Sequence, residues 1–318
     1  MLELFTPEGT RINTPQNREI LSSPLGLERA MNNGTIVEGR VTLCDNRLRL
    51  HVDLGCAEGI VEPEDAVYCR AGEERKDIAI LTRVGKPIAF RILSVEHRDG
   101  RLIARLSRRL AQQSCVNHYL SCIRVGDILP ARVTHMEPFG AFLDIGCGVS
   151  SLLSVDCISV SRISHPKDRL TCGDELYVVV KSIDRQSGRI YVSLRELLGT
   201  WEENAALFEA GQTVTGIVRS VENYGIFIEL TPNLAGLAEL REGSEQEARA
   251  RIGKSVAVYI KSIVPERMKI KLVLIDGEAN GVPPTKPRYY LDPHTVTHLD
   301  RWVYSPENAR KLVETVFE

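Results

Sequence analysis

The sequence has no long hydrophobic run and almost no net charge. None of its 318 residues falls in a stretch of about 18 consecutive apolar residues, which excludes an ordinary transmembrane helix. The first residues also lack a basic segment followed by an apolar one, so we expect no secretion signal. With 40 basic and 42 acidic residues the net charge is −2. A uniformly basic domain is therefore excluded, and any affinity for a polyanion must come from local patches.

Paired cysteines and known catalytic motifs are also absent. None of the eight cysteines forms a C-x-x-C pair, so the spacing argues against a zinc site and favours free thiols in a reducing compartment. Together with the missing secretion signal, this predicts a cytoplasmic protein. The sequence contains no phosphate-binding loop and no nucleophile elbow. We therefore expect no enzyme activity, no metal, no cofactor, no membrane contact and no small-molecule substrate.

The informative feature is an internal repeat. The segment ARVTHMEPFGAFLDIG at 131–146 matches GIVRSVENYGIFIEL at 216–230 when Phe139 is set against Tyr224. Further along, VKSI at 180–183 matches IKSI at 260–263. The pieces occur in the same order in both copies, which indicates two units of the same fold.

A weaker third copy lies upstream. GRVT at 39–42 resembles ARVT at 131–134, and DLGC at 53–56 matches DIGC at 144–147. Short alternating runs separated by glycine-containing turns predict about five strands in each unit, which suits a small closed barrel. We therefore predict an all-β chain of three tandem five-stranded barrels joined by short helices.

The connecting segments have helical patterns. Apolar residues recur at helical spacing between 106 and 124, and Thr200 to Glu203 form a capping-box pattern. The expected boundaries are an N-terminal extension at 1–33, barrels at 34–107, 125–195 and 211–276, helical connectors at 108–124 and 196–210, and a C-terminal tail at 277–318. In the tail, Ser305 followed by Pro306 predicts a helix that runs to Phe317.

Strand parity predicts an aromatic surface. Phe142 and Asp144 share one face of their strand, as Phe227 and Glu229 do in the next repeat, because alternate residues of a strand point the same way. We take the carboxylates to mark the solvent face, since a buried unpaired carboxylate is costly. The two rings are then exposed and able to stack on nucleic-acid bases. The alternative is that they cover a barrel end or pack against a helix.

Further candidates flank these rings. Phe139 and Tyr224 each precede a glycine by one residue, beside the predicted strands. Basic residues near the end of the second and third repeats are candidates for phosphate contacts: Lys181, Arg189, Lys261 and Lys269. The first repeat lacks the aromatic pair, and its outer face carries a weaker basic candidate site: Arg47, Arg49, His51 and Arg101. The alternative for these cations is an ordinary solvated surface.

At this point the residues show a family resemblance. FGAFLDIG at 139–146, YGIFIEL at 224–230 and DRQSGRIYVSLRE at 184–196 resemble motifs of the S1-type RNA-binding domain, which occurs in tandem in ribosomal protein S1 of bacteria. The resemblance extends over 34–276 and is weakest in the first repeat. It implies OB-fold barrels that bind single-stranded RNA through two aromatics, a histidine, an aspartate and an arginine.

The resemblance assigns these contacts residue by residue. In the second repeat they correspond to Phe139, Phe142, Ser154, Asp184 and Arg189. In the third they correspond to Tyr224, Phe227, Glu239, Val264 and Lys269. Serine, glutamate and valine at these positions depart from the family pattern, and Glu239 would repel phosphate.

The resemblance implies that the chain binds mRNA in translation, with single-stranded RNA and the small ribosomal subunit as partners. The alternative is a docking or scaffold protein, of the ribosome or of an RNA-processing complex, whose barrels mainly contact other proteins. The tail also carries Asp292, His294, His298 and Asp300, but their spacing matches no standard metal site.

Overall fold

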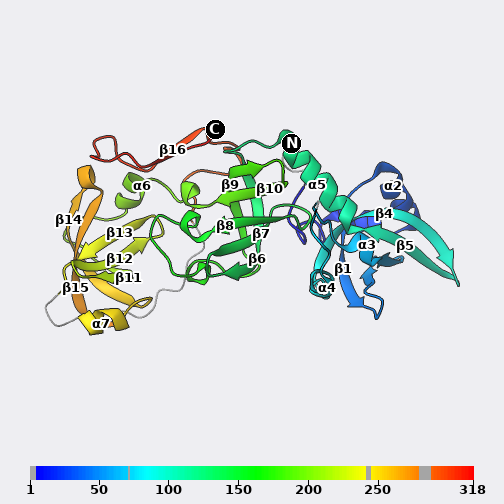
Figure 1. The fold of residues 1–318 in the computed structure, drawn as a ribbon, viewed down its shortest axis with the longest axis horizontal. Coiled ribbons are helices and arrows are strands. Elements are labelled where there is room, and N and C mark those ends of the chain that lie inside the picture. Colours follow the sequence, from blue (N-terminus) through cyan, green and yellow to red (C-terminus); the bar gives the residue numbers. More distant parts are fainter. Residues whose placement is uncertain (1–4, 71, 241–244, 279–287) are drawn as a thin grey trace.

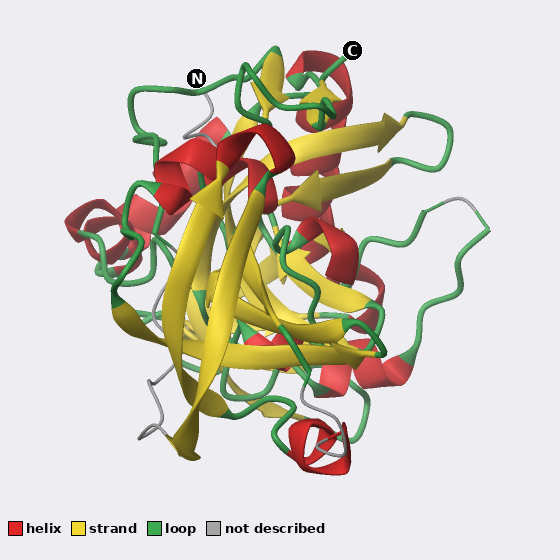
Figure 2. Cartoon of the chain, turned by 90° about the vertical axis from the view of Figure 1, so that its left-hand side faces the viewer, coloured by secondary structure: helices red, strands yellow, loops and turns green. Residues whose placement is uncertain are grey.

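In the computed structural model, which describes residues 5–70, 72–240, 245–278 and 288–318, the strands form three closed five-stranded barrels in a row (Figure 1). Helices connect and flank the barrels, and Figure 2 shows them lying outside the strands. This confirms the prediction of an all-β chain with three tandem barrels. Within the described ranges, no helix is both long and apolar enough to cross a membrane. All eight cysteines are free thiols.

The first barrel has the strand order β1-β2-β3-β5-β4. Its strands are β1 Val37–Cys44, β2 Leu50–Asp53, β3 Glu58–Val61, β4 Pro87–Arg98 and β5 Arg101–Ser107. Neighbouring strands are antiparallel except β3 and β5, which run parallel and close the barrel. Two short helices, α3 (Pro63–Ala66) and α4 (Asp77–Leu81), lie between β3 and β4.

The second and third barrels repeat this topology. The second consists of β6 Ile128–Glu137, β7 Gly140–Asp144, β8 Ser150–Ser154, β9 Glu175–Asp184 and β10 Arg189–Ser193. The third consists of β11 Thr213–Glu222, β12 Gly225–Thr231, β13 Leu234–Ala238, β14 Ser255–Val264 and β15 Lys269–Glu278. In both, the third and fifth strands are the parallel pair. Each first strand also carries a register shift at the same relative place, so the sequence repeat is a structural repeat.

Short helices and 3-10 turns fill the remaining connections. They are η2 Val155–Cys157, η3 Pro166–Asp168, η4 Arg195–Leu197, α6 Trp201–Ala205, α7 Glu245–Ala250 and η5 Pro265–Arg267. The predicted capping box at α6 is present, with Thr200 Oγ1 accepting from the Glu203 backbone and Glu203 reaching back to Thr200. Two N-terminal helices, α1 (Pro15–Leu21) and α2 (Pro24–Asn33), pack beside the first barrel.

The predicted tail helix is wrong. The residues between 301 and 318 form a two-stranded hairpin of β16 (Arg301–Val303) and β17 (Glu314–Val316). Ser305 does not cap a helix; its Oγ accepts the backbone N–H of Val313 at 2.6 Å and joins the two arms. Burial outweighs the local helix signal, because Trp302 and its neighbours pack into the core cluster that spans the second and third barrels. Residues 279–287 of the expected tail lie outside the described ranges.

The interpretation of the two strand carboxylates as solvent-facing is also wrong. Asp144 and Glu229 are only 3% and 4% exposed, although the parity itself holds and Leu143 and Ile228 face the core. Other parts of the chain cover them. Glu229 receives hydrogen bonds from Arg169 of the second barrel and Arg219 of its own barrel. Buried carboxylates with such partners avoid the penalty that the sequence argument assumed.

Asp144 belongs to a buried polar cluster between the first and second barrels. It accepts the backbone N–H groups of Glu8, Gly146 and Gly148 at 2.7 to 2.9 Å. Glu8 in turn forms a two-pronged ion pair with Arg108 at 2.7 and 2.9 Å, and its carboxylate accepts the N–H of Ala89 in β4. Arg108 begins α5 (Arg108–Cys122), the helix between the two barrels. The N-terminal segment, both barrels and the connecting helix therefore meet at one ion pair.

Replacing Arg108 with Ala should destabilise the protein by about 3–5 kcal/mol, because it leaves the Glu8 carboxylate buried without its cation. The adjacent Arg109 is a matched control: it is half-exposed and pairs with Asp65, so Arg109→Ala should cost less than about 1 kcal/mol. Urea unfolding followed by circular dichroism measures both. Equal losses of unfolding free energy in the two variants would show that the buried pair stabilises the protein no more than the surface pair does.

A second buried carboxyl makes stability depend on pH. Glu38 in β1 accepts the N–H groups of Gly9 and Arg11 at 3.0 and 2.9 Å. Burial, together with a smaller effect of the nearby Glu8, raises the pKa of Glu38 from 4.5 to about 7, although the hydrogen bonds from Arg11 and Gly9 lower it. The folded protein thus keeps a proton that the unfolded chain has released between these values. The contribution of this proton to the free energy of unfolding is complete below pH 4.5 and is lost as the pH rises through about 7.

Glu38→Gln should remove this part of the pH dependence, since the amide keeps an acceptor oxygen and does not ionise. The difference between the unfolding free energies at about pH 5 and about pH 8 should shrink by at most about 3 kcal/mol. Urea midpoints at both pH values give the comparison, with Glu19→Gln on the exposed face of α1 as the control. An unchanged pH profile in the Glu38 variant would contradict the assignment.

Candidate nucleic-acid interface

The second barrel presents two aromatic side chains at its surface. Phe139 lies in the β6–β7 turn and is 55% exposed, and Phe142 on β7 is half-buried. Their ring centroids are 6.0 Å apart and the planes meet at 89°. Gly140 lets the turn lie against β8, since a Cβ there would come within 2.5 Å of the Leu153 carbonyl oxygen. The sequence pattern predicted both rings, and the structure brings them together.

The third barrel has the same arrangement. Tyr224 is 63% exposed and Phe227 is half-buried, with centroids 6.1 Å apart and planes again at 89°. Gly225 is at the position equivalent to Gly140, and a Cβ on Gly225 would come within 2.6 Å of the Ala238 carbonyl oxygen. Two barrels with different sequences thus keep one ring geometry at their surfaces.

Sequence reasoning missed two aromatic neighbours of Phe142. His135 on β6 lies across from Phe142 in register, with centroids 6.1 Å apart and planes only 23° from parallel. Tyr191 on β10 pairs with Leu152 on β8, which pairs with Phe142, so these side chains form an outward row. The register shift in β6 and the parallel pairing of β10 are not local features, and therefore no short motif signals either residue.

Two of the predicted polar contacts in the second barrel have partners of their own. Lys181 is exposed, and its Nζ lies 2.9 Å from the Cys157 sulfur, a hydrogen bond that raises the pKa of Lys181. Asp184 accepts the N–H groups of Gln186 and Ser187 and shapes the hairpin turn; the Ser187 hydroxyl bond lowers its pKa. Both side chains remain at the surface.

Arg189 begins β10, two residues from Tyr191, and lies on the same side of the strand. Its guanidinium is 3.3 Å from Glu73, which comes from the loop between α3 and α4 of the first barrel. Burial opposes ionisation of Glu73, but the hydrogen bonds from Arg189 and from the Arg70 backbone outweigh it and lower its pKa. A carboxylate from the neighbouring barrel therefore occupies the predicted phosphate contact.

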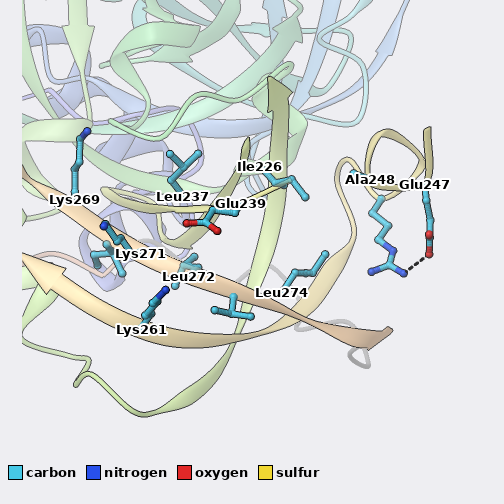
Figure 3. Close-up of a pocket in the computed structure, with 13 residues that line it drawn as sticks. Ile226, Leu237, Glu239, Glu247, Ala248, Lys261, Lys269, Lys271, Leu272 and Leu274 are labelled. Atoms are coloured by element: carbon cyan, nitrogen blue, oxygen red, sulfur yellow. Dashed lines mark hydrogen bonds and ion pairs between the residues drawn. The ribbon is translucent and has the colours of Figure 1, made fainter. Parts of the chain in front are cut away.

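In the third barrel the lysines share one hollow of about 310 Å³ (Figure 3). Lys261, Lys269 and Lys271 follow one another along it, with Leu237 and Glu239 to one side of them. The register places Lys271 in line with Leu237 and Phe227, where the second barrel has Tyr191. The predicted Lys261 and Lys269 thus line one hollow, and Glu239 adds a negative charge to the same hollow.

The first barrel differs. Its candidate cations Arg49 and His51 are held by acidic residues of the same barrel: Arg49 bonds Asp45 at 2.8 Å, and His51 bonds Glu58 at 2.7 Å. Arg47 and Arg101 are exposed, at opposite hairpins of the barrel. Leu48, the residue aligned with Phe139, has a left-handed backbone with φ 61°. The described surface of this barrel contains no ring pair like the other two.

The tail histidines serve packing contacts. His298 Nδ1 lies 2.6 Å from the Asp127 carboxylate at the start of the second barrel, and its Nε2 lies 3.2 Å from Asp300. His294 packs edge-on against Tyr177 of β9. Among the described residues, no group of three or more histidine, cysteine or acidic side chains has a metal-binding arrangement.

The fold and the site together define a chain of tandem OB barrels, two of which carry a pair of aromatic rings at the surface. Residues 123–195, the second barrel, match the S1 RNA binding domain family. A curated relative, small ribosomal subunit protein bS1 of Leuconostoc lactis, is 30% identical over 195 residues, which cover 59% of this chain and 45% of that protein. The bS1 protein of Staphylococcus aureus strain COL is 27% identical over 84% of this chain and 69% of that protein.

The second barrel thus matches the S1 RNA binding domain family, and the chain as a whole is similar to small ribosomal subunit protein bS1 of bacteria. It spans about half the length of the Leuconostoc relative. Among solved structures, a multidomain protein with nucleic acid binding domains from Streptococcus pneumoniae TIGR4 is 16% identical over 76% of this chain and 73% of that chain, with a TM-score of 0.24. GSP13 from Bacillus subtilis is 26% identical over 23% of this chain and 56% of that chain, with a TM-score of 0.22.

If Glu73 competes with phosphate for Arg189, Glu73→Gln should strengthen binding of a single-stranded RNA. We expect a gain of less than about fivefold, because an exposed ion pair is weak. Fluorescence anisotropy at low salt measures it. Glu74→Gln, an exposed neighbour on the same loop, is the control. Equal affinities for the Glu73 and Glu74 variants would show that Arg189 is not blocked.

Proposed function

We propose that the chain binds single-stranded RNA through the aromatic faces of its second and third barrels. The observation that supports this most is the ring pair, repeated at 6.0 and 6.1 Å with the same 89° angle in two barrels. Exposed rings fixed by strand pairing offer π-faces to bases, and each stacked base contributes about 1–3 kcal/mol. The match of the second barrel to the S1 RNA binding domain family supports the same substrate.

Local charge complements the rings. The whole chain has a net charge of −2, so a general attraction to polyanions does not supply the affinity. Instead, Arg189 and Lys181 lie at the surface of the second barrel, Arg189 on the same side of β10 as Tyr191. In the third barrel three lysines line one hollow, and one of them, Lys271, is in register with Leu237 and Phe227. Glu239 lines the same hollow, so we expect the third barrel to bind phosphate less strongly than the second.

We further propose that the RNA is mRNA and that the chain acts in translation with the small ribosomal subunit. The support is that the curated relatives are small ribosomal subunit proteins. This role places the chain in the cytoplasm, as the sequence predicts. It is a binding role without catalysis, and neither of these relatives is described as an enzyme.

The docking alternative applies best to the first barrel. Its Arg49 and His51 are engaged by Asp45 and Glu58 within the barrel, and the aromatic pair is replaced. A barrel of this kind offers no stacking platform. We therefore assign RNA contact mainly to the second and third barrels and protein contact to the outer surface of the first.

The double variant Phe142→Ala and Phe227→Ala should lose most of the affinity for single-stranded RNA, because each ring contributes a stacked base. The parent protein should prefer the single strand to a duplex, and its affinity should fall as salt rises. Anisotropy with a labelled oligoribonucleotide measures both properties.

Tyr259→Ala is the matched control, since Tyr259 is 40% exposed on β14 and belongs to neither ring pair. It should bind as the parent does. Parent-like binding by the double variant would refute the stacking proposal, whereas binding to a duplex equal to that of the single strand would refute the substrate class.

A further inference from the structure

A cleft of about 340 Å³ lies between the first and second barrels, directly beside the platform formed by the ring pair of Phe139 and Phe142. The second barrel supplies Phe142 and His135 to one wall, together with the hydroxyl residues Thr134 and Ser150. The first barrel supplies Tyr68, Arg70 and Arg83 to the other. Phe142 therefore belongs to both the ring pair and the cleft.

The two arginines reach the cleft from different segments. Arg70 follows β3 and α3, and its Nε lies beside Gly188 of the β9–β10 hairpin, 3.7 Å from where a Cβ would stand. Arg83 precedes β4 and lies next to the buried pair of Glu8 and Arg108. The cleft lining also contains the carboxylates of Glu8, which is paired with Arg108, and of Asp144. Arg70 and Arg83 add two positive charges from a barrel that has no ring pair of its own.

Neither guanidinium has a close carboxylate partner, and Arg83 donates one long hydrogen bond of 3.4 Å to the Thr82 hydroxyl. The Nε atoms of both arginines are buried and lack a hydrogen-bond partner among the described residues. The nearest carboxylate oxygens are distant: Glu73 lies 3.8 Å from Arg70, and Glu8 lies 3.7 Å from Arg83. Burial, together with the adjacent positive charge of Arg108, lowers the pKa of Arg83. An anion with several oxygens in the cleft would satisfy these donors, because the guanidinium fork matches phosphate.

We infer that the cleft binds a phosphate group of single-stranded RNA, held by Arg70 and Arg83 while a base of the same strand stacks on Phe142. This inference rests on the proposed function, since the ring is what brings the strand to the cleft. It makes the first barrel part of the RNA site of the second barrel. The strand would then run from the platform toward the joint between the two barrels.

The test measures the binding of a labelled oligouridylate of about 12 nucleotides, a length that one OB barrel can accommodate. The variants are Arg70→Gln and Arg83→Gln. Each should weaken binding several-fold at low salt and flatten the plot of log affinity against log salt by about 0.7, the value for one phosphate contact on a single strand. Arg75 is exposed in the same loop as Arg70, between α3 and α4, and does not line the cleft. The control variant Arg75→Gln should therefore bind the RNA as tightly as the parent does.

A double-mutant cycle tests the link to the ring. Combining Arg70→Gln with Phe142→Ala should cost less than the sum of the two single effects, because both residues hold the same nucleotide. Arg70 makes no ion pair with the buried Glu8, unlike Arg83, so it decides the outcome should Arg83→Gln unfold in a thermal melt. Inorganic phosphate is a second probe: loss of its binding in the arginine variants with unchanged RNA affinity would place a free anion, not the strand, in the cleft and would overturn the inference.

The two proposals fail in different ways. Absence of RNA binding by the parent, or parent-like binding when both rings are removed, refutes the proposed function. If Phe142→Ala weakens binding while Arg70→Gln and Arg83→Gln bind as Arg75→Gln does, only the inference about the cleft is wrong.

Discussion

The relation between the first two barrels depends on one buried ion pair. Arg108 starts the connecting helix, and Glu8 comes from the N-terminal segment. The Glu8 carboxylate also accepts the backbone N–H of Ala89 in β4, and the Glu8 backbone N–H donates to the Asp144 carboxylate. Because a buried charge without its partner is costly, all these segments must be in place at once. The position of Arg83 in the cleft follows from the same cluster, since Glu8 is the carboxylate nearest to it.

The net charge of −2 matters for RNA binding because many of the cations already form ion pairs within the chain. Several cations hold the structure together: Arg108 pairs with Glu8, Arg169 and Arg219 with Glu229, and Arg49 with Asp45. The charges that remain for a polyanion are few and local. An RNA site in this chain therefore needs its aromatic rings more than a strongly basic protein would.

The sequence predicted the barrels because alternation and turns are local signals that recur in three copies. It also predicted the ring pairs, since parity places Phe142 and Phe227 away from the core. It could not predict what covers the outer face, so Asp144 and Glu229 were assigned to solvent although distant arginines and N–H groups bury them. In the tail, the local signal of Ser305 and Pro306 gave way to the burial of Trp302. His135 depends on a strand register that no motif encodes.

The carboxylate near the end of the second strand then has a role that the repeats share. Asp144 faces the N-terminal segment and the first barrel, and Glu229 faces Arg169 of the second barrel. Each residue joins its own barrel to what precedes it in the row. Asp53, the matching residue of the first barrel, is exposed, and the described residues that precede this barrel form the helices α1 and α2. The position of Asp144 and Glu229 thus connects each barrel to the part of the chain before it. Between the first and second barrels, this connection keeps Arg70 and Arg83 of one barrel in the same cleft as Phe142 of the other.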